Sequence, residues 1–240
     1  MQLHLPWPAR RSQAEPAAAR QLLIAGESIP VTIARHRRAR RYVLRVAPDG
    51  TLRLTVPRSG SIAGGLQFAG KQTEWIVRER QRQEDRAQPW REGTTLWFRG
   101  EHVTVALDGT VAVLGPERVV VSDVATGVRE SIEARLRILA ARELPPRCLE
   151  LAATRRMTVA RVAVRNHRSR WGACSLRGVI TLNWRLVQMS ASVVDYIIWH
   201  ELTHLEHPNH SPKFWRAVAA VCPGWRDAER WLRRHGREVL

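Results

Sequence analysis

The 240-residue sequence lacks the long apolar segments that mark membrane insertion or export. No run approaches the roughly 18 consecutive apolar residues that a membrane-spanning helix needs. The N-terminal segment, MQLHLPWPARRSQAEPAAARQLLIAG, interrupts its apolar residues with Arg and Pro, so it does not have the continuous apolar core of a secretory signal. We expect residues 1–20 to form a flexible leader. We also expect a cytoplasmic protein without a membrane partner.

Cysteine is scarce. The chain has three cysteines, Cys148, Cys174 and Cys222, and none belongs to a C-x-x-C pair. An odd number without paired spacing argues against a disulfide framework and against a cysteine-rich zinc site. We interpret all three as reduced, mostly buried thiols.

Lysine is almost absent, because only Lys71 and Lys213 are lysines among 39 basic residues. With 22 acidic residues the formal net charge is +17, an excess that points to nucleic acid as a partner. The strong preference for Arg, together with abundant Ala, equally fits a genome-wide codon bias and a solvated Arg-rich surface. The densest basic runs are RHRRARR, Arg35–Arg41, and RVAVRNHRSR, Arg161–Arg170. The charge alone does not decide between these interpretations.

Residues 21–127 have the pattern of a small, mainly β region. Apolar and polar residues alternate over residues 29–57 on either side of PDG, which predicts a β-hairpin. Residues 61–87 predict one helix, or two short ones, ending in a charged, exposed stretch. Strand patterns return in TTLWFRGEHVTVAL and VAVLGPERVVVS.

Residues 128–240 alternate helical and strand patterns, so the whole chain is expected to be of the α+β class. Ile132, Leu136 and Leu139 have helical spacing and are followed by Pro145-Pro146 and further helical sequence. Strand patterns cover residues 159–164 and 179–182. The segment SASVVDYIIWHELTHL predicts an amphipathic helix that begins at Ser190 or Ser192, where Ser192 and Asp195 approximate a capping box.

Eleven residues, HELTHLEHPNH from His200 to His210, contain four histidines and two glutamates. His200 and His204 are four residues apart, so on a helix both imidazoles lie on one face and can reach one Zn²⁺. Glu201 lies next to the first ligand, where its carboxylate can hold a water molecule as general base. This H-E-x-x-H pattern therefore predicts two metal ligands and a catalytic carboxylate.

His210 is the expected third ligand. It follows Pro208, which should end the helix and let the chain turn back toward the metal. His207 occupies the place of the glycine in H-E-x-x-H-x-x-G-x-x-H, so we assign it to the turn and not to the ligands. A carboxylate of the last helix, Asp227 or Glu229, is a less favoured alternative ligand. We predict one zinc ion per chain on His200, His204 and His210.

The segments RSRWGACS, GVITLNWRLV and VVDYIIWHELTHLEHPNHSPKFW resemble the YgjP-like metallopeptidase family, a group of zincins related to SprT-like proteases. Upstream, APDGTLRLTVP and KQTEWI resemble the N-terminal β region of that family. The resemblance implies a zincin-like catalytic domain at residues 128–240 with an active-site H-E-x-x-H helix. It also implies zinc on His200, His204 and His210 and Glu201 as the catalytic acid/base. Ala173 replaces the serine of the usual WGSCS motif.

The activity expected from these residues is hydrolysis of a peptide or protein substrate by a metal-activated water, with Glu201 as general base. We expect the strand GVITLN to be the sheet edge beside which an extended peptide lies. Candidates for oxyanion or substrate contacts are Asn166, His167, Arg170 and Asn183.

Two other functions fit part of the pattern. The same zinc site could serve a metal-dependent nucleotide phosphohydrolase, although the chain has no glycine-rich phosphate loop. The basic charge also fits a nucleic-acid-associated protein, including a protease that acts on DNA-bound proteins.

Overall fold

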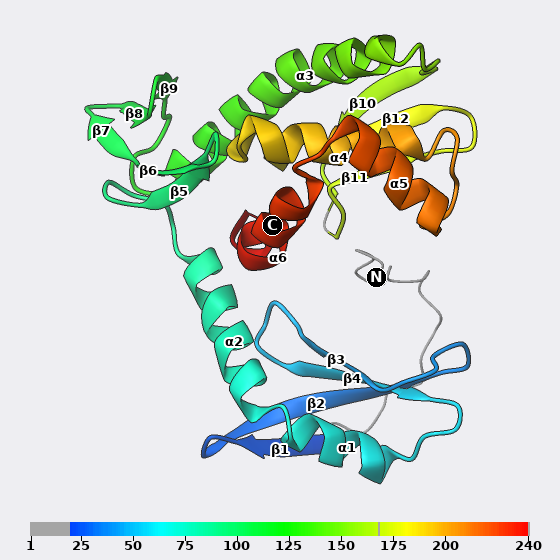
Figure 1. Cartoon of the computed structure of the whole chain (residues 1–240). Helices are drawn as coiled ribbons and strands as arrows, with labels where there is room; N and C mark the ends of the chain where they lie inside the picture. The colour runs from blue at the N-terminus through cyan, green and yellow to red at the C-terminus, as the bar shows by residue number, and fades with distance from the viewer. Residues whose placement is uncertain (1–19, 168, 240) are drawn as a thin grey trace. The chain divides into compact units, whose positions relative to one another are not determined.

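A computed structural model of the chain describes residues 20–167 and 169–239. They form two compact units, the first ending at Gln88 and the second beginning at Pro89 (Figure 1). The flexible leader expected over residues 1–20 lies outside the described residues, except for Arg20, which begins the first strand. Within the described part of the chain, no helix is both long and apolar enough to cross a lipid bilayer.

The first unit is a four-stranded sheet with two helices packed on one face. The strands lie in the order β1, β2, β4, β3, with β2 and β4 parallel and the other neighbours antiparallel. Apolar residues alternate along the strands, and those of one face form a closed core with the helices. The elements are β1 (Arg20–Ile24), β2 (Glu27–His36), β3 (Val43–Val46), β4 (Leu52–Pro57), α1 (Ile62–Gly70) and α2 (Thr73–Ala87).

The predicted hairpin around PDG is confirmed as β3 and β4. The Ala47 N–H donates to the Thr51 carbonyl at 2.8 Å, and the Asp49 carboxylate accepts the Thr51 N–H at 3.0 Å. Gly50 has φ +78°, a conformation that disfavours most other residues. The helical prediction for residues 61–87 is also confirmed, as the pair α1 and α2.

The second unit combines three small sheets with four α-helices. Strand β12 is the central strand of the third sheet, where it pairs in parallel with β10 and antiparallel with β11. The elements are β5 (Thr95–Phe98), β6 (Glu101–Thr104), β7 (Ala106–Asp108), β8 (Val111–Leu114), β9 (Glu117–Val120), α3 (Val128–Thr154), β10 (Arg161–Arg165), β11 (Gly172–Cys174), β12 (Val179–Asn183), the 3₁₀ turn η1 (Trp184–Gln188), α4 (Ala191–Thr203), α5 (Pro212–Val221) and α6 (Trp225–Val239).

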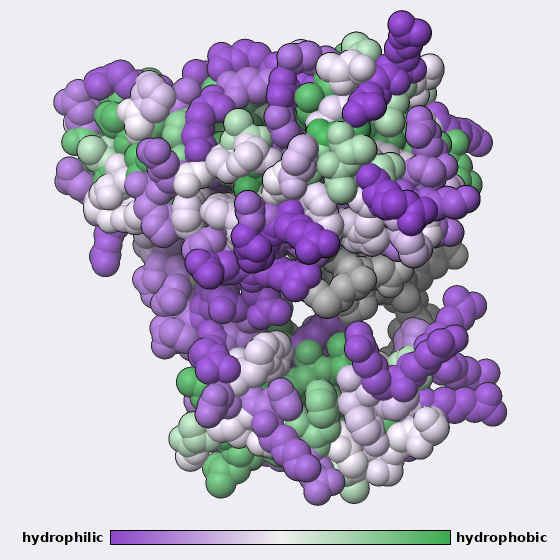
Figure 2. Space-filling model, viewed as in Figure 1, coloured by the Kyte–Doolittle hydropathy of each residue, from purple (hydrophilic) through white to green (hydrophobic). Residues whose placement is uncertain are grey.

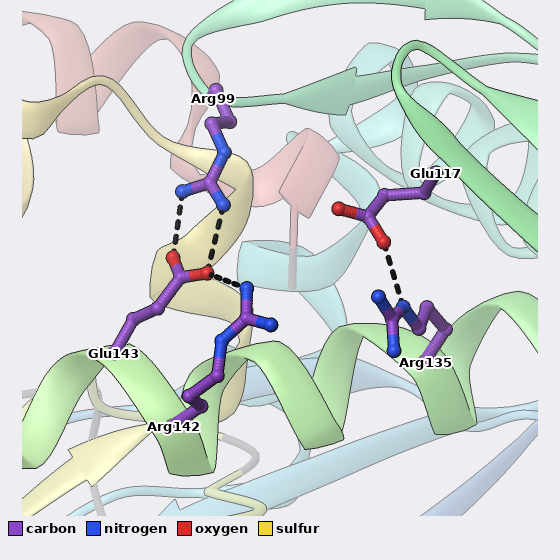
Figure 3. Close-up of polar contacts among 5 residues, drawn as sticks. All are labelled: Arg99, Glu117, Arg135, Arg142 and Glu143. Carbon is purple, nitrogen blue, oxygen red and sulfur yellow. Dashed lines mark hydrogen bonds and ion pairs between the residues drawn. The ribbon is translucent and has the colours of Figure 1, made fainter.

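The small sheets β5–β6 and β7–β9 are anchored on α3. The Arg99 guanidinium donates two hydrogen bonds to the Glu143 carboxylate at 2.7 and 2.9 Å, and Arg142 donates to the same carboxylate (Figure 3). Arg135 of α3 donates to Glu117 of β9 at 2.6 Å. Apolar residues of these sheets, including Phe98 and Leu114, share one buried core with α3. The domain division suggested near residue 127 therefore lies inside the second unit.

The prolines of α3 and the N-terminus of α4 differ from what local sequence rules predict. Helix α3 continues through Pro145 and Pro146, with Leu144 and Cys148 buried on either side, so burial of the apolar face outweighs the lost hydrogen bonds. Helix α4 has Ser190 as its N-cap, and no side-chain capping hydrogen bond forms there. Asp195 instead accepts two hydrogen bonds from Arg147 of α3, one of them at 2.8 Å.

Candidate metal centre

Helix α4 carries the first part of the site because most of its surface is buried. Val193, Ile197 and Ile198 lie in the core of the second unit, and this packing fixes the rotation of the helix. His200 and Glu201 lie in its last turn, and His204 is its C-cap residue. The end of the helix therefore presents both histidines beside a short turn.

The turn after α4 brings His210 back to the two helical histidines. The potential ligand atoms of His200, His204 and His210 all lie within 4.8 Å of one another, and the Nε2 atoms of His200 and His210 are 2.9 Å apart. Next, the Ser211 hydroxyl accepts the Phe214 N–H at 3.4 Å and begins α5 directly after the third histidine. Among the described residues, these three histidines are the group of His, Cys, Asp or Glu side chains with metal-binding geometry.

The apolar wall behind the histidines is Phe214 of α5, whose side chain is fully buried. Its ring centroid lies 4.9 Å from that of His200, 4.6 Å from that of His204 and 4.7 Å from that of His210. A ring that touches all three imidazoles restricts their rotation. It also excludes water from that side of the group.

The His204 ring is oriented by the backbone of the turn. Its Nδ1 lies 3.1 Å from the carbonyl oxygen of His207. A carbonyl oxygen only accepts, so Nδ1 carries the proton and the lone pair of Nε2 remains for a metal ion. His207 thus contributes through its main chain, in agreement with its expected place in the turn.

Glu201 is the one buried acidic side chain among the described residues, with 7% of its surface exposed. It packs on the backbone of β11. A Cβ atom at Gly172 would lie 2.6 Å from Glu201 Cγ and 2.7 Å from its Oε1, so only glycine leaves room for this carboxylate. The backbone N–H of Cys174 donates to the same carboxylate.

Burial determines the proton affinity of this carboxylate. It raises the pKa of Glu201 to about 8, against the opposing effects of the Arg170 charge and the Cys174 N–H. A carboxyl group with a pKa near neutrality can both take and return a proton under physiological conditions. The arrangement is therefore suited to general acid–base chemistry next to the histidines.

The donor set fits a catalytic zinc ion. Three imidazole ligands leave the fourth position of a tetrahedral zinc ion for a water molecule, which is a known arrangement of catalytic zinc sites. The alternative ligands on α6 are engaged elsewhere, since Asp227 forms an ion pair with Arg230 and Glu229 forms one with Arg233. They do not join the histidine group.

Of the four candidates for oxyanion or substrate contacts, only Arg170 affects the pKa of Glu201, which its charge lowers. Asn183 is fully buried, and its amide nitrogen donates to the carbonyls of His167 and Arg170 at 2.9 and 3.0 Å. Asn166 is exposed and accepts from Trp184 and Arg185. Asn183 and Asn166 therefore hold backbone or surface groups in place.

His167, the remaining candidate, is half-buried. Its Nε2 lies 3.3 Å from the Thr181 hydroxyl. Burial, followed by the charges of Arg170 and Arg165, lowers the pKa of this imidazole below its ordinary value. It is therefore mainly neutral at neutral pH.

Sequence reasoning missed two residues of the site, Gly172 and Phe214. The available signal for Gly172 was a glycine between Trp171 and Ala173 in a strand, which often marks the close approach of another group.

The strand GVITLN was expected to be the sheet edge, and this was wrong. It is β12, and because β10 and β11 both pair with it, β11 is the edge strand that meets α4.

Comparison with known proteins adds the family. Comparison with curated proteins gave no match. Among solved structures, the metallopeptidase zymogen abylysin of Pyrococcus abyssi is 24% identical with a TM-score of 0.33, over 42% of this chain and 99% of that one. The sequence model of the YgjP-like metallopeptidase domain matches residues 40–235, which span both units. The chain therefore belongs to the YgjP-like metallopeptidase family.

Proposed function

We propose that the chain is a zinc-dependent peptidase in which His200, His204 and His210 hold one zinc ion and Glu201 is the general base. The observation that carries this proposal is the convergence of the three imidazoles within 4.8 Å, next to a carboxylate that is 7% exposed. Membership of a metallopeptidase family supports the same chemistry.

A zinc ion, when bound, supplies Lewis-acid polarisation of the scissile carbonyl and activation of the attacking water. The chain's own residues supply the proton transfers. Glu201 accepts a proton from the attacking water and delivers it to the nitrogen of the leaving amine. The Cys174 N–H and the packing on Gly172 hold the carboxylate for both steps. The Arg170 charge favours the anionic form that accepts the proton.

The substrate is proposed to be an extended peptide that lies beside β11. This strand pairs with β12 along one edge, with Ala173 opposite Thr181, and lies against α4 near the general base. Main-chain pairing with an edge strand binds peptides of many sequences. A nucleotide phosphohydrolase has less support, because the convergent group contains no carboxylate ligands for a two-metal phosphate site.

The test is elemental analysis of the purified full-length protein and its variants. We expect about one zinc per chain in the wild type and in Glu201→Gln, and a loss of affinity beyond about 100-fold in His204→Ala. His207→Ala is the matched control, since its side chain lies outside the ligand group and only its carbonyl is used. Zinc retained by His204→Ala, or lost equally from His207→Ala, would refute the ligand assignment.

Peptidase activity is measured on the same proteins with an unfolded protein substrate. Glu201→Gln should lower the rate by about 10²- to 10⁴-fold while keeping its zinc. Glu206→Gln, which removes an exposed carboxylate of the same segment, should leave the rate unchanged. If the Glu201 variant cleaves as fast as the wild type, another group is the base.

A further inference from the structure

The first unit has a strongly basic surface that includes none of the residues of the metal centre. Between residues 35 and 58 the sequence has eight arginines and one acidic residue, Asp49. All eight arginines are exposed. We call this set the arginine surface: Arg35 at the end of β2, Arg37, Arg38, Arg40 and Arg41 in the β2–β3 loop, Arg45 on β3, Arg53 on β4 and Arg58 after β4.

Part of this surface is the face of the sheet that the helices leave uncovered. Leu44, Leu52 and Leu54 point to the core formed with α1 and α2, so Arg45 and Arg53 alternate to the other face. The two arginines are direct partners in the β3–β4 register. Like charges placed directly opposite each other destabilise a sheet, so the fold itself gains nothing from this pair.

Other arginines of the same unit do have counter-charges. On α2 of the same unit, Arg78, Arg80 and Arg82 each form an ion pair with a glutamate. None of the eight arginines forms an ion pair within 4.0 Å with any carboxylate of residues 20–239 that the structure describes. Asp49, the acidic residue nearest in sequence, binds the hydroxyl and N–H of Thr51. A codon bias explains many arginines, but it does not explain where carboxylates are missing.

We propose that the arginine surface binds nucleic acid through the phosphate backbone, without reading the base sequence. The planar guanidinium group matches the geometry of a phosphate, and an array over a loop and two strands suits a polymer with regularly spaced phosphates. Figure 2 shows strongly hydrophilic side chains at the end of this sheet where the β2–β3 loop lies.

The surface favours nucleic acid over a lipid bilayer. Stable membrane-surface binding combines basic charges with an apolar face, and the apolar sides of α1 and α2 are used in the core. The exposed large hydrophobic residues of this unit, Leu23 and Val77, lie on β1 and α2, outside the segments that carry the arginines.

The one Phe, Tyr or Trp residue between residues 35 and 58 is Tyr42, and it is held by contacts within the fold. Tyr42, the aromatic residue nearest in sequence, donates its hydroxyl proton to the Ser61 carbonyl and stacks on Phe68. Sequence-independent contacts to phosphates are therefore the expected mode of binding.

The experiment measures fluorescence anisotropy of labelled 20-base single-stranded and duplex DNA of mixed sequence with the full-length protein, at several salt concentrations. The test variant replaces Arg37, Arg38, Arg40 and Arg41 with serine. The matched control replaces Arg226, Arg230, Arg233 and Arg234 of α6 with glutamine, which removes the same charge from the other unit. A second test variant, Arg45→Thr with Arg53→Thr, covers the case in which the loop variant fails to fold.

We expect saturable binding by the wild type that weakens steeply with salt. The loop variant should bind at least about 10-fold more weakly and show a shallower salt dependence, by about one unit of the logarithmic slope for each phosphate that the variant no longer binds. The control should stay within about threefold of the wild type. Equal weakening in both variants, or binding that does not saturate, would reduce the effect to bulk charge and overturn the proposal.

A parallel titration with phosphatidylserine vesicles separates the two anionic surfaces. Vesicle binding that depends on the loop arginines, with no DNA binding, would also overturn the proposal. All arms are run with and without a chelator. The arginine surface and the metal centre consist of different residues, so the result for this surface does not depend on the proposed peptidase activity.

Discussion

The chain uses arginine in two opposite ways, and one region of each unit illustrates one of them. In the second unit Arg99, Arg135 and Arg147 each bind a carboxylate from another element, and these pairs join small sheets and α4 to α3. In the first unit Arg45 and Arg53 lie opposite each other on an uncovered face. Composition alone cannot distinguish these uses, because the residue type is the same. The placement of carboxylates does distinguish them. Arginines beside a carboxylate hold the fold together, and arginines without one are proposed to bind a partner.

The largest effect of a single substitution is expected at the metal centre, where the second unit buries the Glu201 carboxylate. We expect Gly172→Ala to lower the peptidase rate by about 10- to 100-fold, because the added methyl group would displace this carboxylate. Zinc content should stay near the wild-type value, since the histidines come from other segments. The control is Gly70→Ala, where a Cβ meets no atom within 4 Å. A Gly172→Ala protein as active as the wild type would show that the carboxylate does not need this position.

Loss of the ion pair between Arg99 and Glu143 in the second unit should have a smaller but measurable effect, on the free energy of unfolding. Hydrogen bonding to Arg99, followed by Arg142, lowers the pKa of Glu143. A lowered carboxyl pKa means that the pair stabilises the fold above the unfolded-state value near 4.5, and that this stability is lost as the pH falls through the folded-state value.

Glu143→Gln should therefore destabilise the fold by about 1 kcal/mol at pH 7, since the pair is partly exposed. The difference should shrink as the pH falls below 4.5 and through the folded-state pKa of Glu143. Urea unfolding of both proteins at pH 7 and at a series of pH values below 4.5 measures this. A difference that stays the same over the whole series would mean that packing, and not charge, accounts for the effect.

The smallest effect is expected on the arginine surface. Arg45→Thr removes one member of the like-charge pair and leaves a residue that favours strands, so the free energy of unfolding should change by less than about 0.5 kcal/mol, in the stabilising direction. The same urea titration at low salt detects it. Destabilisation as large as that of Glu143→Gln would erase the distinction between the two units.

The sequence contained enough local information for the hairpin at PDG, the helices of residues 61–87 and the histidine segment. These features depend on residues close together in the chain, whose spacing and turn chemistry are visible in one sequence. The parallel pairing of β2 with β4 and the central position of β12 depend on which strands meet in space, and no local pattern specifies that.

The contacts of the candidate site were harder to predict than its residues. Asn183, Asn166 and Arg170 are all polar and close to the strands of the site, so residue type did not distinguish them. Burial did, because the fully buried Asn183 has both side-chain groups engaged by the backbone. Likewise, Pro145 and Pro146 are residues that disfavour the interior of a helix, whereas α3 continues through them with the neighbouring Leu144 and Cys148 buried.

The three imidazoles belong to an eleven-residue segment, while the neighbours of Glu201 come from far away in the sequence. Closing so short a loop costs little chain entropy, and contacts of low sequence separation form early during folding. A newly made chain can therefore gather the proposed ligands before β11 docks and seats the carboxylate. On this order of folding, the chain can bind metal before it can cleave a peptide bond, because cleavage also requires the long-range contact between Glu201 and β11.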